Sequence, residues 1–187
     1  MRIETIIDAL ERHPVIAAAS DMPGFNRALA GEPEVIFHLN LSLLSAKEVI
    51  TAAKEKGKYI FVHIDLTDGI GKDKTGIEWL ASLGADGIIS TRPHLIKTAG
   101  ESGLLTIQRF FALDSKGLLS IREMIAAAKP DLIEIMPGVI TKVIGSFSGN
   151  GIPVIAGGLL ESKAEVTAAL SAGALAISTG KQELWAL

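Results

Sequence analysis

The sequence has no cysteine, few aromatic residues and no large excess of charge of either sign. The absence of cysteine excludes disulfides and cysteine-based chemistry, and it agrees with a reducing compartment. Aromatic residues make up 5% of the 187 residues, and the formal net charge is −3. The composition therefore does not indicate the basic, aromatic-rich surface that is typical of non-specific nucleic-acid binding.

Long hydrophobic runs are also lacking. The longest uncharged run, Val143–Leu160, contains five glycines and a proline, whereas a membrane-spanning helix needs about 20 mostly apolar residues. The first segment, MRIETIIDALERHP, has acidic residues where a signal peptide would be apolar, and its apolar side chains fall on one helical face: Ile3, Ile6, Ile7 and Leu10. We therefore expect an amphipathic N-terminal helix, no membrane partner and a cytoplasmic location.

What the sequence does contain is a series of short apolar or β-branched runs, which recur about every 23 residues. Most runs are apolar throughout, as is typical of strands that are covered on both faces in a parallel sheet. No linker or low-complexity segment interrupts the series, so we expect a single domain over residues 1–187. The runs are Val15–Ala19, Val35–Leu39, Tyr59–Ile64, Gly87–Ser90, Leu104–Phe111, Leu132–Met136, Pro153–Ala156 and Ala174–Ser178.

Helical patterns lie between these runs. Ser45–Lys56 and Ser162–Ala172 each begin with a serine that is followed three residues later by a glutamate, which predicts a capping box. Ser115–Lys129 is stopped by Pro130. Eight strands, each followed by a helix or a turn, predict an α/β fold, a small (β/α)8 TIM-type barrel with short loops and a truncated last helix. An open doubly wound sheet is the alternative, and the lack of a glycine-rich first turn disfavours it.

Polar residues follow the predicted strands, at the end of such a barrel where functional groups lie. Because all eight strands of a barrel end at the same mouth, these residues predict one binding site. They are Ser20 and Asp21; His38 and Asn40; His63, Asp65, Asp68 and Lys72; Thr91, Arg92 and His94; Arg109; Glu134; Gly157 and Gly158; and Ser178, Thr179 and Gly180.

The strongest local pattern lies after the last two predicted strands. Gly157 and Gly158 allow backbone N–H groups to approach a ligand closely. The segment Ser178–Gly180 lies where we expect the last helix to begin, and a helix N-terminus favours an anion. The loops after strands 7 and 8 form the recurrent phosphate site of this fold, so the pattern predicts phosphate binding. The alternative is a tight turn and an ordinary helix cap.

Two residues after the third strand have several interpretations. By strand alternation, His63 and Asp65 are expected to face the same way, and a carboxylate at the mouth can accept hydrogen bonds from a polyol. Asp68 has the same two interpretations as Asp65, ligand binding or capping of the next helix. Together with His38, His63 and Asp65 have a spacing compatible with a metal, but a hydrogen-bonded strand histidine is the favoured interpretation, and no metal or cofactor is predicted.

Glu134 lies in the apolar run LIEIMPG, where a buried carboxyl would suit a general acid or base. Pairing with Arg109 on the neighbouring strand is the favoured alternative. Asp73 and Lys74 are assigned to the surface and to the start of the next helix. The sequence has no nucleophile–base motif, no Walker A sequence and no dinucleotide fingerprint.

Five blocks of the sequence, taken in order across about two thirds of the chain, resemble the glycerol uptake operon antiterminator regulatory family. The blocks are HIDLTDGIGKDKTGIEWL, GIISTRPHLIKTA, IEIMPGVITKVI, PVIAGGLLESKAEV and ALAISTGKQELW. The resemblance implies a small barrel that senses glycerol 3-phosphate and acts on leader mRNA to prevent early termination of glycerol-utilisation transcripts.

The resemblance also implies roles for residues of the mouth. The phosphate would be held by Gly157, Gly158, Ser178, Thr179 and Gly180. The glycerol hydroxyls would meet Asp65, with His63, Asp68, Lys72 and Glu134. Positive charge near phosphate or RNA would come from Arg92, Arg109 and Lys97. A modest basic rim is expected in or near the loops after strands 3, 4 and 5 from Lys72, Lys74, Arg92, Lys97 and Lys116.

Two hypotheses from different classes follow. The first is a regulator without catalytic activity that responds to glycerol 3-phosphate and binds leader mRNA. The second is an isomerase or aldolase that acts on a sugar or triose phosphate, with Asp65 and Glu134 as acid and base. The sequence leaves open whether the protein forms a homo-oligomer.

Overall fold

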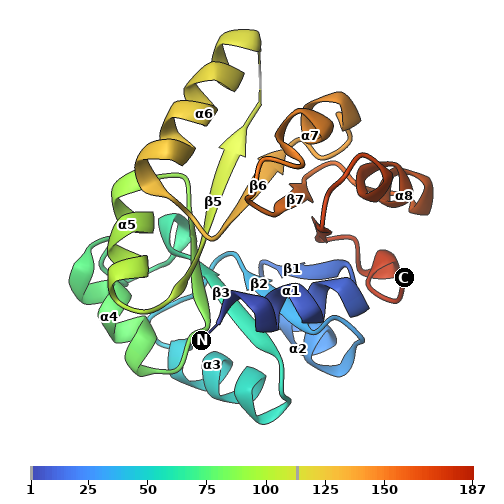
Figure 1. Cartoon of the computed structure of the whole chain (residues 1–187). Helices are drawn as coiled ribbons and strands as arrows, with labels where there is room; N and C mark the ends of the chain where they lie inside the picture. The colour runs from blue at the N-terminus through green and yellow to red at the C-terminus, as the bar shows by residue number, and fades with distance from the viewer. Residues whose placement is uncertain (1, 113) are drawn as a thin grey trace.

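The computed structural model describes residues 2–112 and 114–187. It contains a closed barrel of parallel strands in chain order, in which β8 pairs with β1. Helices surround the strands, as Figure 1 shows. The predicted (β/α)8 architecture is therefore confirmed. The strands are β1 (Val15–Ala19), β2 (Val35–His38), β3 (Tyr59–His63), β4 (Gly87–Ser90), β5 (Leu105–Phe111), β6 (Leu132–Met136), β7 (Val154–Gly157) and β8 (Ala176–Thr179).

The helices alternate with the strands, and β8 is followed by the short 3-10 helix η2 (Gln182–Leu184), in agreement with the expected truncated last unit. A second 3-10 helix, η1 (Ile64–Leu66), follows β3. The α-helices are α1 (Ile3–Arg12), α2 (Met22–Ala30), α3 (Ala46–Glu55), α4 (Lys74–Ser82), α5 (Pro93–Glu101), α6 (Ser115–Ala128), α7 (Thr141–Phe147) and α8 (Lys163–Ser171). Within the described residues, no helix has the length and apolar character needed to cross a membrane.

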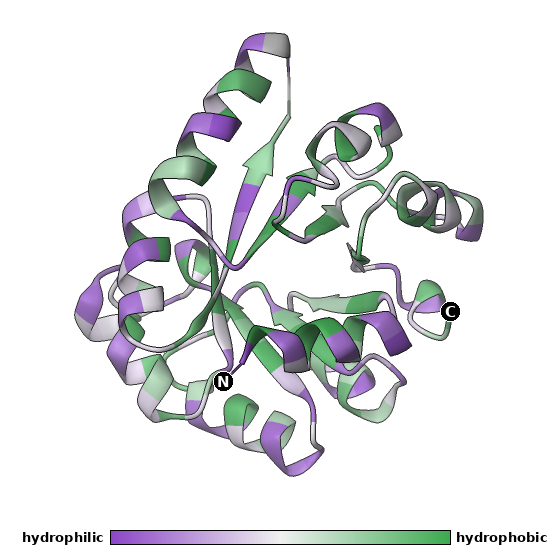
Figure 2. Ribbon diagram, viewed as in Figure 1, coloured by the Kyte–Doolittle hydropathy of each residue, from purple (hydrophilic) through white to green (hydrophobic). Residues whose placement is uncertain are grey.

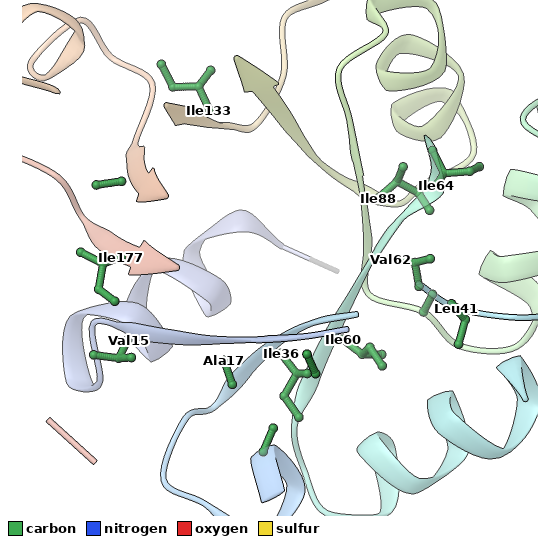
Figure 3. Close-up of a cluster of buried hydrophobic side chains, with 14 of the residues drawn as sticks. Val15, Ala17, Ile36, Leu41, Ile60, Val62, Ile64, Ile88, Ile133 and Ile177 are labelled. Carbon is green, nitrogen blue, oxygen red and sulfur yellow. The ribbon is translucent and has the colours of Figure 1, made fainter. Parts of the chain in front are cut away.

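The apolar side chains form two layers, one on each side of the barrel wall. The outer layer packs between strands and helices and includes Ile36, Ile60, Val62 and Ile88 (Figure 3). Apolar residues accordingly dominate the strands, whereas the helices alternate between apolar and polar residues (Figure 2). Burial of each large apolar side chain contributes about 1.5–3 kcal/mol, which explains why the strand sequences are mostly apolar.

The inner layer fills the barrel and continues onto α1. Phe37 and Phe61 lie in an edge-to-face arrangement with ring centroids 5.9 Å apart. Ile6 and Leu10 of α1 belong to the same buried cluster. The predicted amphipathic helix therefore closes the end of the barrel at which the strands begin.

Helix N-termini are held mainly by aspartates. Asp21, Asp73 and Asp114 each accept a hydrogen bond from the backbone N–H three residues later, at 2.7, 3.0 and 2.7 Å. The capping box predicted at Ser162 and Glu165 is confirmed. The one predicted at Ser45 is wrong, because the Ser45 hydroxyl makes no capping bond and instead donates to the carbonyl oxygen of Ser42 at 3.4 Å.

Two strand ends differ from the sequence predictions in ways that affect the mouth. β3 ends at His63, and the chain turns into η1, so the strand alternation from which a common facing of His63 and Asp65 was expected does not reach Asp65. β8 includes Ser178 and Thr179, and η2 begins only at Gln182. The expectation that Ser178–Gly180 forms a helix N-terminus is therefore wrong.

Candidate functional site

A cavity of about 160 Å³ opens at the end of the barrel where the strands finish. It is smaller than the roughly 300–1,000 Å³ of sites for drug-sized ligands, so it suits a small molecule. Six of the residues that sequence analysis placed at the mouth line it: Arg109, Glu134, Gly158, Ser178, Thr179 and Gly180. Its other lining residues are Ala18, Leu39, Met136 and Leu159.

The loop after β7 presents backbone N–H groups on one side. The carbonyl oxygens of Gly157 and Gly158 both accept from the N–H of Gly138, at 2.6 and 3.1 Å. Because C=O and N–H point in opposite directions within a trans peptide unit, the N–H groups of Gly158 and Leu159 point away from Gly138. Gly158 and Leu159 both have left-handed backbone conformations, with φ of 76° and 59°. Successive N–H groups aligned in this way form an anion-binding concavity.

These N–H groups are available for a ligand. Within residues 2–112 and 114–187, the N–H groups of Gly158, Leu159 and Gly180 make no hydrogen bond to another backbone or side-chain acceptor. Gly157 and Ser178 are direct neighbours in the β7–β8 ladder, so the two glycine-containing segments meet as the sequence predicted. A Cβ on Gly157 would lie 2.4 Å from Oε1 of Glu134, so a side chain at this position would clash with the cavity floor.

The floor of the cavity is a buried hydrogen-bonded triad. Glu134 has no exposed surface, and Arg109 and Ser178 are 8% and 4% exposed. Nε of Arg109 donates to Oε2 of Glu134, and the Ser178 hydroxyl donates to Oε1, both at 2.5 Å. The favoured pairing of Glu134 with Arg109 is therefore confirmed. Because Nε makes this contact, the two terminal nitrogens of the guanidinium are left without a side-chain partner in the described chain.

The loop after β8 is tied to the loop after β7. The Thr179 hydroxyl donates to the carbonyl oxygen of Leu160 at 3.0 Å and accepts from the N–H of Lys181 at 3.0 Å. The indole N–H of Trp185 donates to the Thr179 carbonyl oxygen at 2.8 Å. These bonds fix the position of Gly180 between two anchored residues.

His63 is buried inside the barrel close to Arg109. Burial, and then the positive charge of Arg109, lower the pKa of His63 to about 4, so the imidazole is neutral at pH 7. Its Nδ1 is buried without a hydrogen-bond partner among the described residues. His63 is not itself in the wall of the cavity, and its free nitrogen is a group that a bound hydroxyl or water can satisfy.

Asp65 lies on η1 and holds the loop after β4. Its carboxylate accepts from the Ser90 hydroxyl at 2.9 Å and from the N–H and hydroxyl of Thr91 at 2.7 and 2.9 Å. Nε of Arg92 lies 3.6 Å away. Burial alone would raise the pKa of Asp65, but these hydrogen bonds lower it below its usual value.

Comparison with known proteins places the chain in a family. The family described as "Glycerol-3-phosphate responsive antiterminator" matches residues 15–185. This protein belongs to that family. A glycerol uptake operon antiterminator regulatory protein from Listeria monocytogenes has a similar structure, with 32% identity, a TM-score of 0.87, and coverage of 91% of this chain and 94% of its own.

Two further relatives cover almost the whole chain. A glycerol uptake operon antiterminator-related protein from Thermotoga maritima is 34% identical with a TM-score of 0.84, over 94% of this chain and 99% of its own. The Escherichia coli (strain K12) protein YgcP, described as uncharacterized, is 34% identical over 97% of this chain and 96% of its own. Barrels such as a deoxyribose phosphate aldolase from Aeropyrum pernix, at 13% identity and a TM-score of 0.68, share the fold alone.

Other residues that the sequence singled out lie outside the cavity of this antiterminator-family barrel. Asp68 and Lys72 are exposed in the loop between η1 and α4. Arg92 directly precedes α5, and Lys97 lies on its exposed face. His38 faces α2, with its ring 5.6 Å from that of Phe25. Within residues 2–112 and 114–187, no group of three or more His, Cys, Asp or Glu residues is arranged to hold a metal.

Sequence reasoning missed several residues of the candidate site. Leu159 lines the cavity and is 68% exposed, and its position directly after the Gly157-Gly158 pair was the available signal. Lys181 lines an adjoining hollow of about 230 Å³ that shares Leu159, Thr179 and Gly180 with the cavity. Gly138, which orients the loop after β7, carries no local signal for this role.

Proposed function

We propose that the protein binds glycerol 3-phosphate in the cavity at the mouth of the barrel and that this binding controls its action on the leader mRNA of glycerol-utilisation operons. The observation that carries the proposal is the meeting of unpaired backbone N–H groups and the Arg109 guanidinium in one small cavity. The membership of the chain in a family described as glycerol-3-phosphate responsive supports the same ligand.

The phosphate would lie between the loops after β7 and β8. The N–H groups of Gly158, Leu159 and Gly180 would donate to its oxygens, and the terminal nitrogens of Arg109 would supply positive charge from below. Hydrogen bonds to a charged acceptor are roughly twice as strong as neutral ones. The pairing of Arg109 with Glu134 fixes the direction of the guanidinium, so little side-chain entropy is lost when the phosphate binds.

The glycerol moiety would extend from the phosphate toward the centre of the barrel. His63 is the residue that we assign to a glycerol hydroxyl, because its Nδ1 is buried and unpaired among the described residues. We assign Asp65 a positioning role, since both its oxygens already accept hydrogen bonds from Ser90 and Thr91. Asp68 and Lys72 would act at the rim and not in the cavity.

Several features favour a regulator over the alternative isomerase or aldolase. Both oxygens of Glu134 are engaged by Arg109 and Ser178, and those of Asp65 by Ser90 and Thr91, so neither carboxylate faces the cavity as a free base. The wall of the cavity contains no lysine, which is the residue that forms a Schiff base with a carbonyl substrate.

The RNA would contact the rim around the mouth. Exposed cationic side chains occur in or beside most loops that follow a strand: Lys72, Lys74, Arg92, Lys116, Lys142, Lys163 and Lys181. Three carboxylates of the same rim cap helices, those of Asp21, Asp73 and Asp114. The cationic side chains of the rim would attract the phosphate groups of an RNA, although Arg92 and Lys74 each lie 3.6 Å from an acidic side chain, those of Asp65 and Glu78.

Isothermal titration of the intact protein tests the ligand. Glycerol 3-phosphate is expected to bind more tightly than inorganic phosphate, and glycerol is expected to show no binding at the same concentration. Failure of both phosphate compounds to bind would remove the proposal. Equal binding of both would leave the anion site standing and would contradict the assignment of the glycerol moiety.

A gel-shift titration tests the RNA partner. The leader RNA of a glycerol-utilisation operon is titrated with protein in the presence and absence of glycerol 3-phosphate, and a scrambled RNA of the same length is the control. A ligand-dependent change in affinity for the leader alone is expected, because a ligand shifts an equilibrium only when it binds two forms differently. Equal binding of both RNAs would contradict leader recognition.

A further inference from the structure

The proton of the Ser178 hydroxyl is engaged by the floor of the mouth cavity. Nε of Arg109 donates to Oε2 of Glu134, and the Ser178 oxygen lies 2.5 Å from Oε1 of the same carboxylate. Arginine stays protonated in proteins, and a cation in contact with a carboxylate favours its ionised form. An ionised carboxylate accepts hydrogen bonds and cannot donate them. The hydrogen between Ser178 and Glu134 is therefore the serine's own.

The Ser178 oxygen consequently presents only lone pairs to the cavity. A serine hydroxyl has one hydrogen and two lone pairs, and Ser178 belongs to the cavity wall although it is buried. Within residues 2–112 and 114–187, its oxygen accepts no hydrogen bond from another side chain or from the backbone. A ligand group beside this oxygen is favourable when it donates a hydrogen and unfavourable when it can only accept one.

Gly157 keeps the Ser178 oxygen accessible. The two residues are neighbours in the β7–β8 ladder, and a Cβ on Gly157 would lie 2.8 Å from the Ser178 oxygen. Gly157 lies in strand β7 and is not among the glycines with a positive φ, so the backbone conformation does not require glycine here. The space that a side chain would fill does require it. The lack of a Cβ leaves room for a ligand group directly beside Ser178.

We propose that Ser178 makes the site select an alcohol over a carbonyl, by accepting a hydrogen bond from the hydroxyl on the central carbon of glycerol 3-phosphate. This inference rests on the proposed function, because it takes the phosphate to lie between the loops after β7 and β8. Ser178 directly precedes Thr179 and Gly180 in the second of these segments, so the ligand group that reaches its oxygen is the one nearest the phosphate. A phosphate dianion has no hydrogen to donate, and Ser178 is therefore assigned to the glycerol moiety.

The other polar groups assigned to the ligand do not make this distinction. The terminal nitrogens of Arg109 and the backbone N–H groups of the two loops are donors, and an alcohol oxygen and a carbonyl oxygen both accept from them. The neutral imidazole of His63 offers a donor or an acceptor according to its tautomer. The role of Ser178 is fixed, because Glu134 holds its proton. A site built to pair with a ligand hydroxyl rejects an analogue without it, since a buried polar atom is then left unpaired.

Titration calorimetry of the intact wild-type protein with three organic phosphates tests the selection. Dihydroxyacetone phosphate differs from glycerol 3-phosphate by a carbonyl on the central carbon, and 3-hydroxypropyl phosphate has no oxygen there. Each is expected to bind roughly tenfold more weakly than glycerol 3-phosphate. Binding of either analogue as tightly as glycerol 3-phosphate would overturn the inference and leave the proposed function standing. Failure of glycerol 3-phosphate to bind would remove the proposed function and this inference with it.

Glu134→Gln tests the origin of the selection. The amide oxygen must accept from Nε of Arg109, so the amide nitrogen faces Ser178 and donates to its oxygen. The serine hydrogen is then released and can turn toward the cavity, where Ser178 can donate as well as accept. The ratio of the affinities for glycerol 3-phosphate and dihydroxyacetone phosphate is expected to fall about tenfold, to near one. The loss of a negative charge affects the binding of both phosphates alike and cancels in this ratio.

Glu183→Gln is the matched control, because it removes one negative charge at an exposed position of η2 and should leave the ratio unchanged. A folded Glu134→Gln protein that keeps the wild-type ratio would overturn the role given to Ser178. Circular dichroism shows whether this variant folds. If it does not fold, the comparison of the three ligands on the wild type decides the inference by itself.

Discussion

Arg109 and Glu134 are direct neighbours in the β5–β6 ladder, and Nε of the arginine lies 2.5 Å from Oε2 of the glutamate at the floor of the mouth cavity. The contact neutralises the buried carboxylate and uses the one guanidinium nitrogen that points along the side chain. It thereby leaves the terminal nitrogens available to the proposed phosphate. One pair thus serves both the stability of the barrel and the proposed ligand site, and its two contributions can be separated by substitution.

Arg109→Met is expected to lower the free energy of unfolding by about 3–5 kcal/mol, because it leaves Glu134 as an uncompensated buried charge. The double variant Arg109→Met/Glu134→Gln should recover most of this loss, since the amide keeps the hydrogen bond from Ser178 and carries no charge. Urea denaturation measures the stability, and titration calorimetry measures the ligand. Glycerol 3-phosphate binding should be lost in both variants; binding in the double variant would contradict the role given to Arg109.

Gly138→Ala should weaken phosphate binding from outside the cavity. A Cβ at this position would lie 2.9 Å from the backbone nitrogen of Gly157, so the loop after β7 must shift and its N–H groups lose their alignment. We expect a stability loss of about 1–3 kcal/mol together with a clear loss of affinity for glycerol 3-phosphate. Gly100→Ala in α5 is the control, because its Cβ meets only ordinary contacts and should raise helix stability by about 0.5–1 kcal/mol. Unchanged affinity in Gly138→Ala would contradict the proposed N–H geometry.

Asp65→Ala is expected to act on stability more than on ligand discrimination. The substitution removes the acceptor of three hydrogen bonds from Ser90 and Thr91 and should reduce the free energy of unfolding by about 1–3 kcal/mol. The ratio of the affinities for glycerol 3-phosphate and inorganic phosphate should stay the same, since that ratio reports contacts to the glycerol hydroxyls. A fall in the ratio would show that Asp65 contacts the polyol, as the sequence first indicated.

Lys181→Met should reduce the affinity for glycerol 3-phosphate about fivefold at low ionic strength. Lys181 lines the hollow that adjoins the cavity, where its charge would attract a phosphate dianion without a fixed contact. The effect should fade as salt is added, because exposed charges are screened. Lys163→Met, at the exposed start of α8, is the matched control. A loss that does not depend on salt would point to a direct, buried contact.

His38 should make the protein sensitive to mild acid. Burial lowers the pKa of His38 to about 4 from its usual 6.5, against a smaller opposing effect of Asp21. The unfolded chain then binds one more proton than the folded chain between these pH values. The contribution of this residue to stability is therefore fully present above pH 6.5 and falls as the pH is lowered toward 4.

Urea denaturation at pH 7 and pH 5 measures this effect. When the pH falls from 7 to 5, His38→Leu is expected to lose about 2 kcal/mol less stability than the wild type, because it lacks the imidazole that must be protonated. In the wild type this imidazole packs against Phe25, and its ring nitrogens have no partner in the described chain. His94→Leu, at an exposed position, is the control. An unchanged difference between pH 7 and pH 5 in His38→Leu would contradict the assignment.

The barrel itself was open to prediction from sequence because its strands are buried on both faces. Runs such as Gly87–Ser90 and Leu132–Met136 are mostly apolar and match the observed strands at both ends. The pairing of Arg109 with Glu134 followed from the same series, since strands that are adjacent in sequence are adjacent in the barrel. Where burial on two faces decides the structure, a short stretch of sequence is enough to predict the strand.

The predictions failed where a distant partner decides the local structure. Thr179 extends β8 beyond the predicted run Ala174–Ser178 because it pairs with Ala17 on the flanking strand, which no local pattern reveals. Ser45 was expected to cap α3, but its hydroxyl instead donates to the carbonyl oxygen of Ser42, in a loop whose Leu43 is bound to the distant Asp68. Asp65 was assigned by alternation, although the chain leaves the strand two residues earlier.

The same difference holds for the candidate site: features set by adjacent residues could be predicted, and features set by contacts with distant residues could not. The glycine pair at Gly157 and Gly158 was visible as a close-approach signal, and the structure places it against β8. The direction of the N–H groups that follow it depends on the hydrogen bonds from Gly138 in another loop. The sequence around Gly157 and Gly158 does not predict these hydrogen bonds. The role of the glycines in holding a phosphate remains a proposal for the experiments above.

Helix α1, whose Ile6 and Leu10 pack among the side chains that fill the barrel, closes the end of the barrel where the strands begin. A metabolite therefore enters and leaves through the mouth, and its presence is not accessible to a partner at the closed end. A macromolecule that distinguishes the occupied site from the empty one does so best by contacting the mouth, so the sensor and its readout share one face.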